Sequence, residues 1–222
     1  GKRAVNYSRR ALEGLEPRAQ RARGWAHCIL AVGYQMVGEL KQAYAVVHKA
    51  LKEEAQLTST YQSMLYVVLS FVHWIAADLT GLQQATGRAL KLGNDAHLPE
   101  TIGIASYHLG TLHYFRNELK EAESILAAVV KEHYEPSMLN FTHSAFALTL
   151  CYLVQGRPKD AGQMVADILA TALDTNSTEM LPLADAFQAE LAFPQPPTPH
   201  PPTPPAPPPP PPPPPPHPSP SP

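Results

Sequence analysis

Apolar residues recur at helical spacing through residues 4–193, and short polar or glycine-containing steps interrupt them at nearly regular distances. Residues 109–122 show the pattern in full. One apolar helical face ends before Asn117, a turn former, and Leu119 and Ala122 restart the period. Apolar residues three or four apart on both sides of a turn former predict two antiparallel helices joined by a tight corner.

The same pattern occurs four times along the chain. The four copies are residues 30–43, 72–85, 109–122 and 148–161, and their predicted corners are Gly38, Thr80, Asn117 and Gly156. These corners lie 42, 37 and 39 residues apart (38 to 80, 80 to 117, 117 to 156). Self-similarity at such a period is typical of stacked helical hairpins that bury a continuous core between neighbours. We therefore predict an all-α superhelical solenoid.

The residues that repeat are a Leu-Gly-x-x-Tyr-like segment, a Gly or Asn corner, and then Ala, with the Tyr position filled by Tyr34, His113 and Tyr152. This pattern resembles the tetratricopeptide repeat, although the spacing lies between its period of about 34 residues and the roughly 40–47 of HEAT and armadillo units. Long-period units of this kind resemble the sensor region of large ATP-dependent bacterial transcriptional activators of the maltose-regulon-activator type. The resemblance covers residues 4–193.

The period divides the chain into hairpins followed by a proline-rich tail. The expected units are 1–16 (the second helix of a truncated repeat), full repeats at 22–57, 58–97, 98–135 and 136–175, an incomplete repeat at 176–193, and the tail at 194–222. Because the chain opens in mid-repeat without a Met, we interpret it as a fragment of a longer protein. The repeat domain spans 1–193.

The tail dominates the composition. Of 26 prolines, 21 lie in residues 194–222, which contain no charged residue. Such a tract favours an extended polyproline II conformation. Three interpretations stay open: a spacer, a docking site for proline-binding domains, or a terminus foreign to the repeat fold.

Charge and hydropathy exclude several classes of function. The net charge is −2, so nothing indicates direct contact with nucleic acid or a membrane surface. No apolar stretch is long enough to span a membrane, and no signal-peptide core is present. The two cysteines, Cys28 and Cys151, fall inside helical patterns and are expected to be buried thiols. These observations predict a cytoplasmic location.

No residue set has the spacing that catalysis or metal binding needs. The ten histidines form no His-x-x-x-His pair, and the chain has no Cys-x-x-Cys motif. Phosphate-binding loops and nucleophile elbows are missing as well. We expect no enzyme activity, no cofactor and no metal.

The first helices of the hairpins supply the candidate binding surface. With Gly24, Tyr66, Gly103 and Thr142 as position 1, the tetratricopeptide resemblance implies that positions 2, 5, 9 and 12 line a concave groove. The selected groove residues are Trp25, Gln35, Ser70, Trp74, Tyr107, Thr111, Tyr114, His143 and Phe146. Aromatic rings with polar handles suit a protein or peptide partner, and a sugar-like or other small-molecule effector also fits. The alternative is that these rings pack between neighbouring repeats.

Three functions remain open. The resemblance implies an effector-sensing and interaction region of a transcriptional regulator, with an ATPase module and a helix-turn-helix reader elsewhere in the full protein. The alternatives are a plain protein–protein scaffold and the repeat region of a kinase-linked protein.

Overall fold

The computed structural model describes residues 1–53, 58–131, 138–177 and 180–192, and within them the chain is α-helical with no strand. Its helices are α1 (Lys2–Gly14), α2 (Gln20–Met36), α3 (Leu40–Glu53), α4 (Ser59–Ile75), α5 (Leu79–Asp95), α6 (Pro99–Phe115), α7 (Leu119–Lys131), α8 (Met138–Val154), α9 (Pro158–Asp174) and α10 (Leu181–Ala192). The predicted all-α solenoid is confirmed. The proline-rich tail, residues 194–222, lies outside the described residues.

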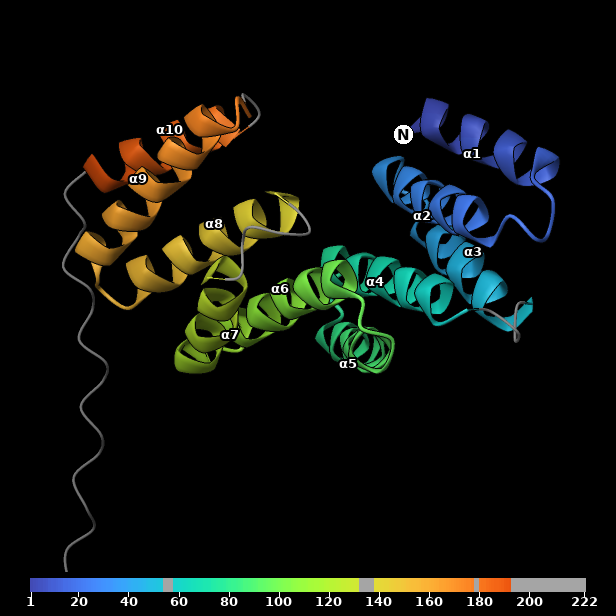
Figure 1. Cartoon of the computed structure of the whole chain (residues 1–222), viewed down its shortest axis with the longest axis horizontal. Helices are drawn as coiled ribbons and strands as arrows, with labels where there is room; N and C mark the ends of the chain where they lie inside the picture. The colour runs from blue at the N-terminus through green and yellow to red at the C-terminus, as the bar shows by residue number, and fades with distance from the viewer. Residues whose placement is uncertain (54–57, 132–137, 178–179, 193–222) are drawn as a thin grey trace, which may run out of the picture.

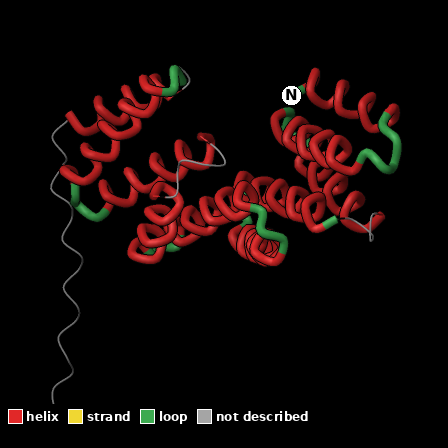
Figure 2. Tube along the Cα trace, viewed as in Figure 1, coloured by secondary structure: helices red, strands yellow, loops and turns green. Residues whose placement is uncertain are grey.

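The helices form antiparallel hairpins that stack side by side (Figures 1 and 2). Each first helix contacts its own second helix and also the first helix of the next hairpin, which places α2, α4, α6 and α8 in one layer. The second helices α3, α5 and α7 fill the space between successive first helices. The chain curves as an open arch, with α1 and α10 at opposite ends (Figure 1).

Each hairpin turns at a residue in the left-handed region. The corner residues are Gly38 (φ 81°), Ala77 (φ 56°), Asn117 (φ 60°) and Gly156 (φ 69°). At every one the next backbone N–H reaches back five residues, as from Glu39 to the Tyr34 carbonyl at 2.9 Å and from Asp78 to the His73 carbonyl at 3.0 Å. This is the Schellman geometry that satisfies the last carbonyls of a helix.

The second corner differs from the sequence prediction. Thr80 lies inside α5, and the turn is made by Ala77, three residues earlier. The corners are therefore 39, 40 and 39 residues apart (38 to 77, 77 to 117, 117 to 156). The prediction failed because an alanine gives no sequence signal for a positive φ, which non-glycine residues seldom adopt.

Small residues let each first helix approach its neighbouring helices closely. Seven residues before each corner stand Ala31, Ser70, Gly110 and Thr149, all of them buried. A Cβ atom on Gly110 would lie only 2.6 Å from Cγ of Leu126 on α7, so the hairpin packing requires glycine there. The buried core includes Leu65, Leu112 and Leu148, each at most 1% exposed.

Candidate functional site

Counting back from the observed corners gives four equivalent rows on the first helices. The row thirteen residues before each corner is Trp25, Met64, Ile104 and His143. The row ten before is Cys28, Val67, Tyr107 and Phe146. The rows six and three before are Val32, Phe71, Thr111 and Leu150, and Gln35, Trp74, Tyr114 and Leu153. We call these sixteen residues the inner rows.

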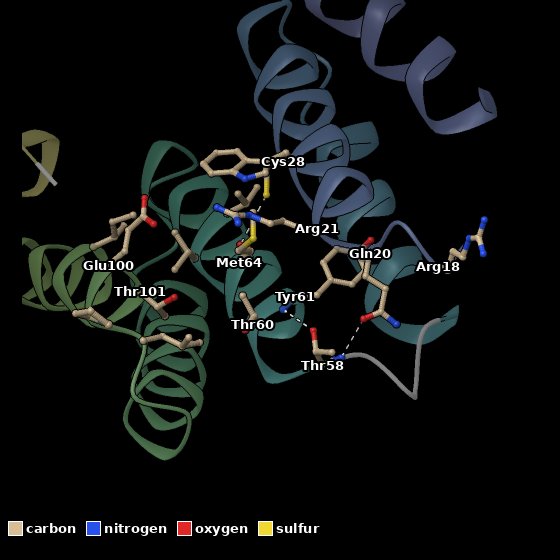
Figure 3. A pocket seen from close by; sticks show the side chains of 16 residues that line it. Arg18, Gln20, Arg21, Cys28, Thr58, Thr60, Tyr61, Met64, Glu100 and Thr101 are labelled. Atoms are coloured by element: carbon tan, nitrogen blue, oxygen red, sulfur yellow. Dashed lines mark hydrogen bonds between the residues drawn. The ribbon is translucent and has the colours of Figure 1, made fainter. Parts of the chain in front are cut away.

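A cavity of about 710 Å³ opens between α2, α4 and α6 (Figure 3). Five inner-row residues line it, and they are Trp25, Cys28, Met64, Val67 and Ile104. The cavity therefore lies on equivalent positions of three successive hairpins. Its volume falls within the roughly 300–1,000 Å³ that is usual for ligand sites.

Opposite charges stand at the two sides of this cavity. Arg18 and Arg21 belong to the α2 side and Glu100 to the α6 side, and Figure 3 shows Arg21 near Met64 with Glu100 across from it. Arg18 is bound to Glu16 at 2.5 Å, so its charge is already partly matched. The cavity thus combines an apolar lining with a small number of charged groups at its rim.

The Cys28 thiol lines the cavity but has no reactive character. Cys28 is 6% exposed, and burial raises its pKa to about 12. Its Sγ lies 3.9 Å from the Met64 carbonyl oxygen, at the limit of a weak hydrogen bond. A thiol with so high a pKa is a poor nucleophile near neutral pH.

Beyond the cavity, aromatic rings continue across α4, α6 and α8. The Trp74 ring lies 6.0 Å from that of Tyr107, almost edge-on at 88°, and the Tyr107 ring lies 5.4 Å from that of His143. Phe71 joins this group through Trp74, with ring centroids 5.8 Å apart. Trp74 and Tyr107 are half-buried, whereas His143 is exposed. Three of the residues selected from sequence are therefore neighbours in space.

Three other selected residues lie between helices, where a partner cannot reach them. Ser70 is 0% exposed, Thr111 7% and Phe146 6%. Ser70 was chosen because the misplaced corner shifted the α4 register by three residues, and it occupies the small-residue position between first helices. The Thr111 hydroxyl donates to the Tyr107 carbonyl at 2.9 Å, and the Phe146 ring stacks on Phe187 of α10 at 5.3 Å. Their selection as groove residues was wrong for this conformation.

The remaining selected residues have mixed environments. Trp25 is 49% exposed and belongs to the cavity. The Gln35 amide donates to the Val72 carbonyl at 3.3 Å, while its Oε1 is buried without a partner among the described residues. Tyr114 is half-buried against the α7–α8 core that contains Cys151. Of these three, Trp25 is the most accessible to a partner.

Met64 and Phe71 were not selected from the sequence, although the correct register places these two inner-row residues of α4 beside Val67 and Trp74. The buried polar contacts that join neighbouring hairpins were not predicted either. Ser70 and His108 are one such pair, with Oγ and Nδ1 2.6 Å apart, and Ser63 and Thr101 are another at 3.1 Å. No pattern in one sequence distinguishes a buried serine from a surface one.

The Ser70–His108 pair cannot serve as a catalytic dyad in this structure. His108 is 4% exposed, and burial lowers its pKa to about 4, so the ring is neutral at pH 7. Ser70 is fully buried and also donates to the Val67 carbonyl at 2.7 Å. A substrate has no access to either group. Among the described residues, moreover, no three His, Cys, Asp or Glu side chains are gathered as a metal site requires.

No helix in the described part of the chain is both long and apolar enough to cross a membrane. Comparison with protein-family models gave no match, and neither did comparison with curated proteins.

Solved structures do resemble the chain. A kinesin light chain-like protein of Podosopora anserina with nearly identical TPR-like repeats has a TM-score of 0.59 at 13% identity, over 79% of this chain and 98% of that one. BtubC (BKLC) from P. vanneervenii has a TM-score of 0.59 at 15% identity, over 88% and 91%. A second Podosopora anserina structure of this kind scores 0.50 at 15% identity, over 85% of each chain. At these identities the likeness concerns the fold alone, which is a solenoid of TPR-like helical hairpins.

Proposed function

We propose that this chain is a non-catalytic binding module that holds a segment of another protein on its inner rows. The observation that carries the proposal is the cavity between α2, α4 and α6, whose apolar lining comes from equivalent positions of three hairpins. A partner would place an apolar side chain in this cavity, against Met64, Val67 and Ile104. The half-exposed Trp25 ring adds a large contact area with one hydrogen-bond donor.

The aromatic group beyond the cavity extends the same surface. Trp74, Tyr107 and His143 come from three successive first helices, so a partner crossing the helices would meet one ring per hairpin. Interfaces are enriched in Trp and Tyr because these rings bury area at a low cost in side-chain entropy. TPR-like proteins share this arrangement of first helices, which supports a scaffold role.

A small-molecule effector is the second candidate, and the cavity volume is the observation that favours it. The transcriptional-regulator interpretation has no support among the described residues and stays a prediction from the sequence resemblance. The kinase-linked interpretation likewise stays a prediction from the sequence.

A selection from a library of displayed peptides tests the leading proposal. We expect peptides selected on the full chain to bind it and to lose at least tenfold in affinity with Val67→Trp, which fills the cavity. Ala128→Trp is the matched control, because Ala128 is exposed on α7 away from the inner rows. Peptides that bind both variants equally would contradict the proposed site. If no peptide is selected and a metabolite binds the wild-type chain but not Val67→Trp, the effector candidate replaces the peptide.

A further inference from the structure

The cavity between α2, α4 and α6 leaves one cation and one anion available to a bound molecule. Of the described residues that line it, only Arg18, Arg21 and Glu100 carry a charge. Arg18 is bound to Glu16. Arg21 and Glu100 are exposed, and neither forms an ion pair within the described part of the chain. The unpaired cation therefore belongs to α2 and the unpaired anion to α6, on opposite sides of the cavity (Figure 3).

The cavity is apolar between these two charges. Met64 and Val67 come from α4, the middle helix, and Ile104 comes from α6. All three side chains are half-buried, so part of each stays open to the cavity. A charge placed against them would lose water without gaining a partner, whereas an apolar side chain gains by leaving water. A molecule that matches the cavity is thus apolar in the middle and charged at both ends.

The stacking of the helices sets the spacing of the two charges. Helix α4 packs against both α2 and α6, which places it between them. Neighbouring helix axes lie about 8–10 Å apart, so about 16–20 Å separate α2 from α6. An extended chain advances about 3.3 Å per residue and directs alternate side chains to the same face. Charges about four to six residues apart in such a chain therefore span the cavity, with one or two same-face apolar side chains between them.

We propose that the partner segment at this cavity is extended and bipolar. It places an acidic side chain beside Arg21, apolar side chains against Met64, Val67 and Ile104, and a basic side chain beside Glu100. This inference rests on the proposed function and specifies the chemistry of its partner. A helical segment would need about 11–13 residues between the same two charges, because a helix rises only 1.5 Å per residue.

Peptide selection on the full chain gives the first test. Among selected peptides that lose affinity with Val67→Trp, we expect an acidic and a basic residue about four to six positions apart, with an apolar residue between them. Cavity-binding peptides without this charge pair, or with the two charges at helical spacing, would overturn the inference.

Charge exchange between chain and peptide gives the second test, by calorimetry at low ionic strength, where exposed charges are least screened. Arg21→Glu should weaken a selected peptide about three- to tenfold, and so should Glu100→Lys, since each replaces an attraction between exposed groups by a repulsion. A peptide whose acidic residue is changed to lysine should regain affinity for Arg21→Glu. A peptide whose basic residue is changed to glutamate should regain it for Glu100→Lys.

The matched controls are Arg88→Glu on α5 and Glu121→Lys on α7, which reverse exposed charges on second helices and should bind the peptide as the wild type does. If the peptide depends on the cavity but neither rim reversal weakens it, or if the controls weaken it equally, the inference fails while the proposed function stands. If no peptide is selected, or if every peptide tolerates Val67→Trp, the proposed function fails and the inference fails with it. Circular dichroism of each variant verifies that its helix content is unchanged.

Discussion

Gly110 offers the sharpest test of how the hairpins pack. An added Cβ would lie 2.6 Å from Cγ and 2.7 Å from Cδ2 of Leu126, whose side chain is 0% exposed. Overpacking of this kind costs about 1–3 kcal/mol. Replacing glycine by alanine within a helix recovers about 1 kcal/mol. We therefore expect Gly110→Ala to lower the free energy of unfolding by up to about 2 kcal/mol.

Gly87 on α5 is the matched control, since no atom outside its own helix lies within 4 Å of the added Cβ. Gly87→Ala should stabilise the chain by about 1 kcal/mol, because only the helix-propensity gain applies. Urea denaturation followed by circular dichroism compares the midpoints. Midpoints are the safer quantity because repeat arrays can lose two-state behaviour. If Gly110→Ala raised the midpoint as much as Gly87→Ala, the close approach of α6 and α7 would be refuted.

Three further changes test the corners, the buried histidine and a helix cap. Ala77 has φ 56°, a left-handed conformation that is costly for alanine and free for glycine, so Ala77→Gly should stabilise the chain by about 1 kcal/mol in urea denaturation. The neighbouring Ala76 has φ −76°, so Ala76→Gly should destabilise the chain. His108 has a folded-state pKa of about 4, below the 6.5 of an unfolded histidine, so stability is complete above pH 6.5 and falls as the pH drops toward 4. The loss amounts to about 3 kcal/mol, and His108→Gln should flatten that part of the pH profile. The carboxylate of Asp78 accepts from the Gly81 N–H at 2.9 Å, so Asp78→Ala should cost about 1 kcal/mol and Asp78→Asn less, as measured by thermal unfolding.

The sequence predicts the fold well because its period and corner chemistry are local. Gly38, Asn117 and Gly156 are residue types that adopt positive φ readily, and the structure turns at all three. Ala77 carries no such signal, because its left-handed conformation depends on the packing of the helices around it. That single error displaced the α4 register by three residues. Val67 and Ser70 were placed at the first two groove positions instead of Met64 and Val67, and Phe71 was missed at the third.

The candidate site was less predictable than the fold. Exposure depends on which neighbouring helix covers a ring, and spacing along one chain does not contain that information. Phe146 is covered by Phe187 of α10, whereas His143, three residues earlier, stays exposed. The cavity itself lies between α2, α4 and α6, and no local pattern describes how three helices are placed relative to one another. Trp25 and Ile104 were already on predicted groove positions, and the structure places both around the cavity.

Binding of a protein segment by the inner rows around the cavity can be measured directly. Trp25 lies at that cavity, and in the variant Trp74→Phe it is the only tryptophan of the chain. The measurement is the Trp25 emission of this variant, titrated with a peptide that lacks tryptophan and was selected on the wild-type chain. We predict a saturable blue shift of this emission. Val67→Trp cannot serve as the blocked control here, because it adds a tryptophan. The control is therefore Val67→Phe in the Trp74→Phe background, which should lose the shift. A peptide that binds by calorimetry yet leaves the Trp25 emission unchanged would contradict binding at these rows.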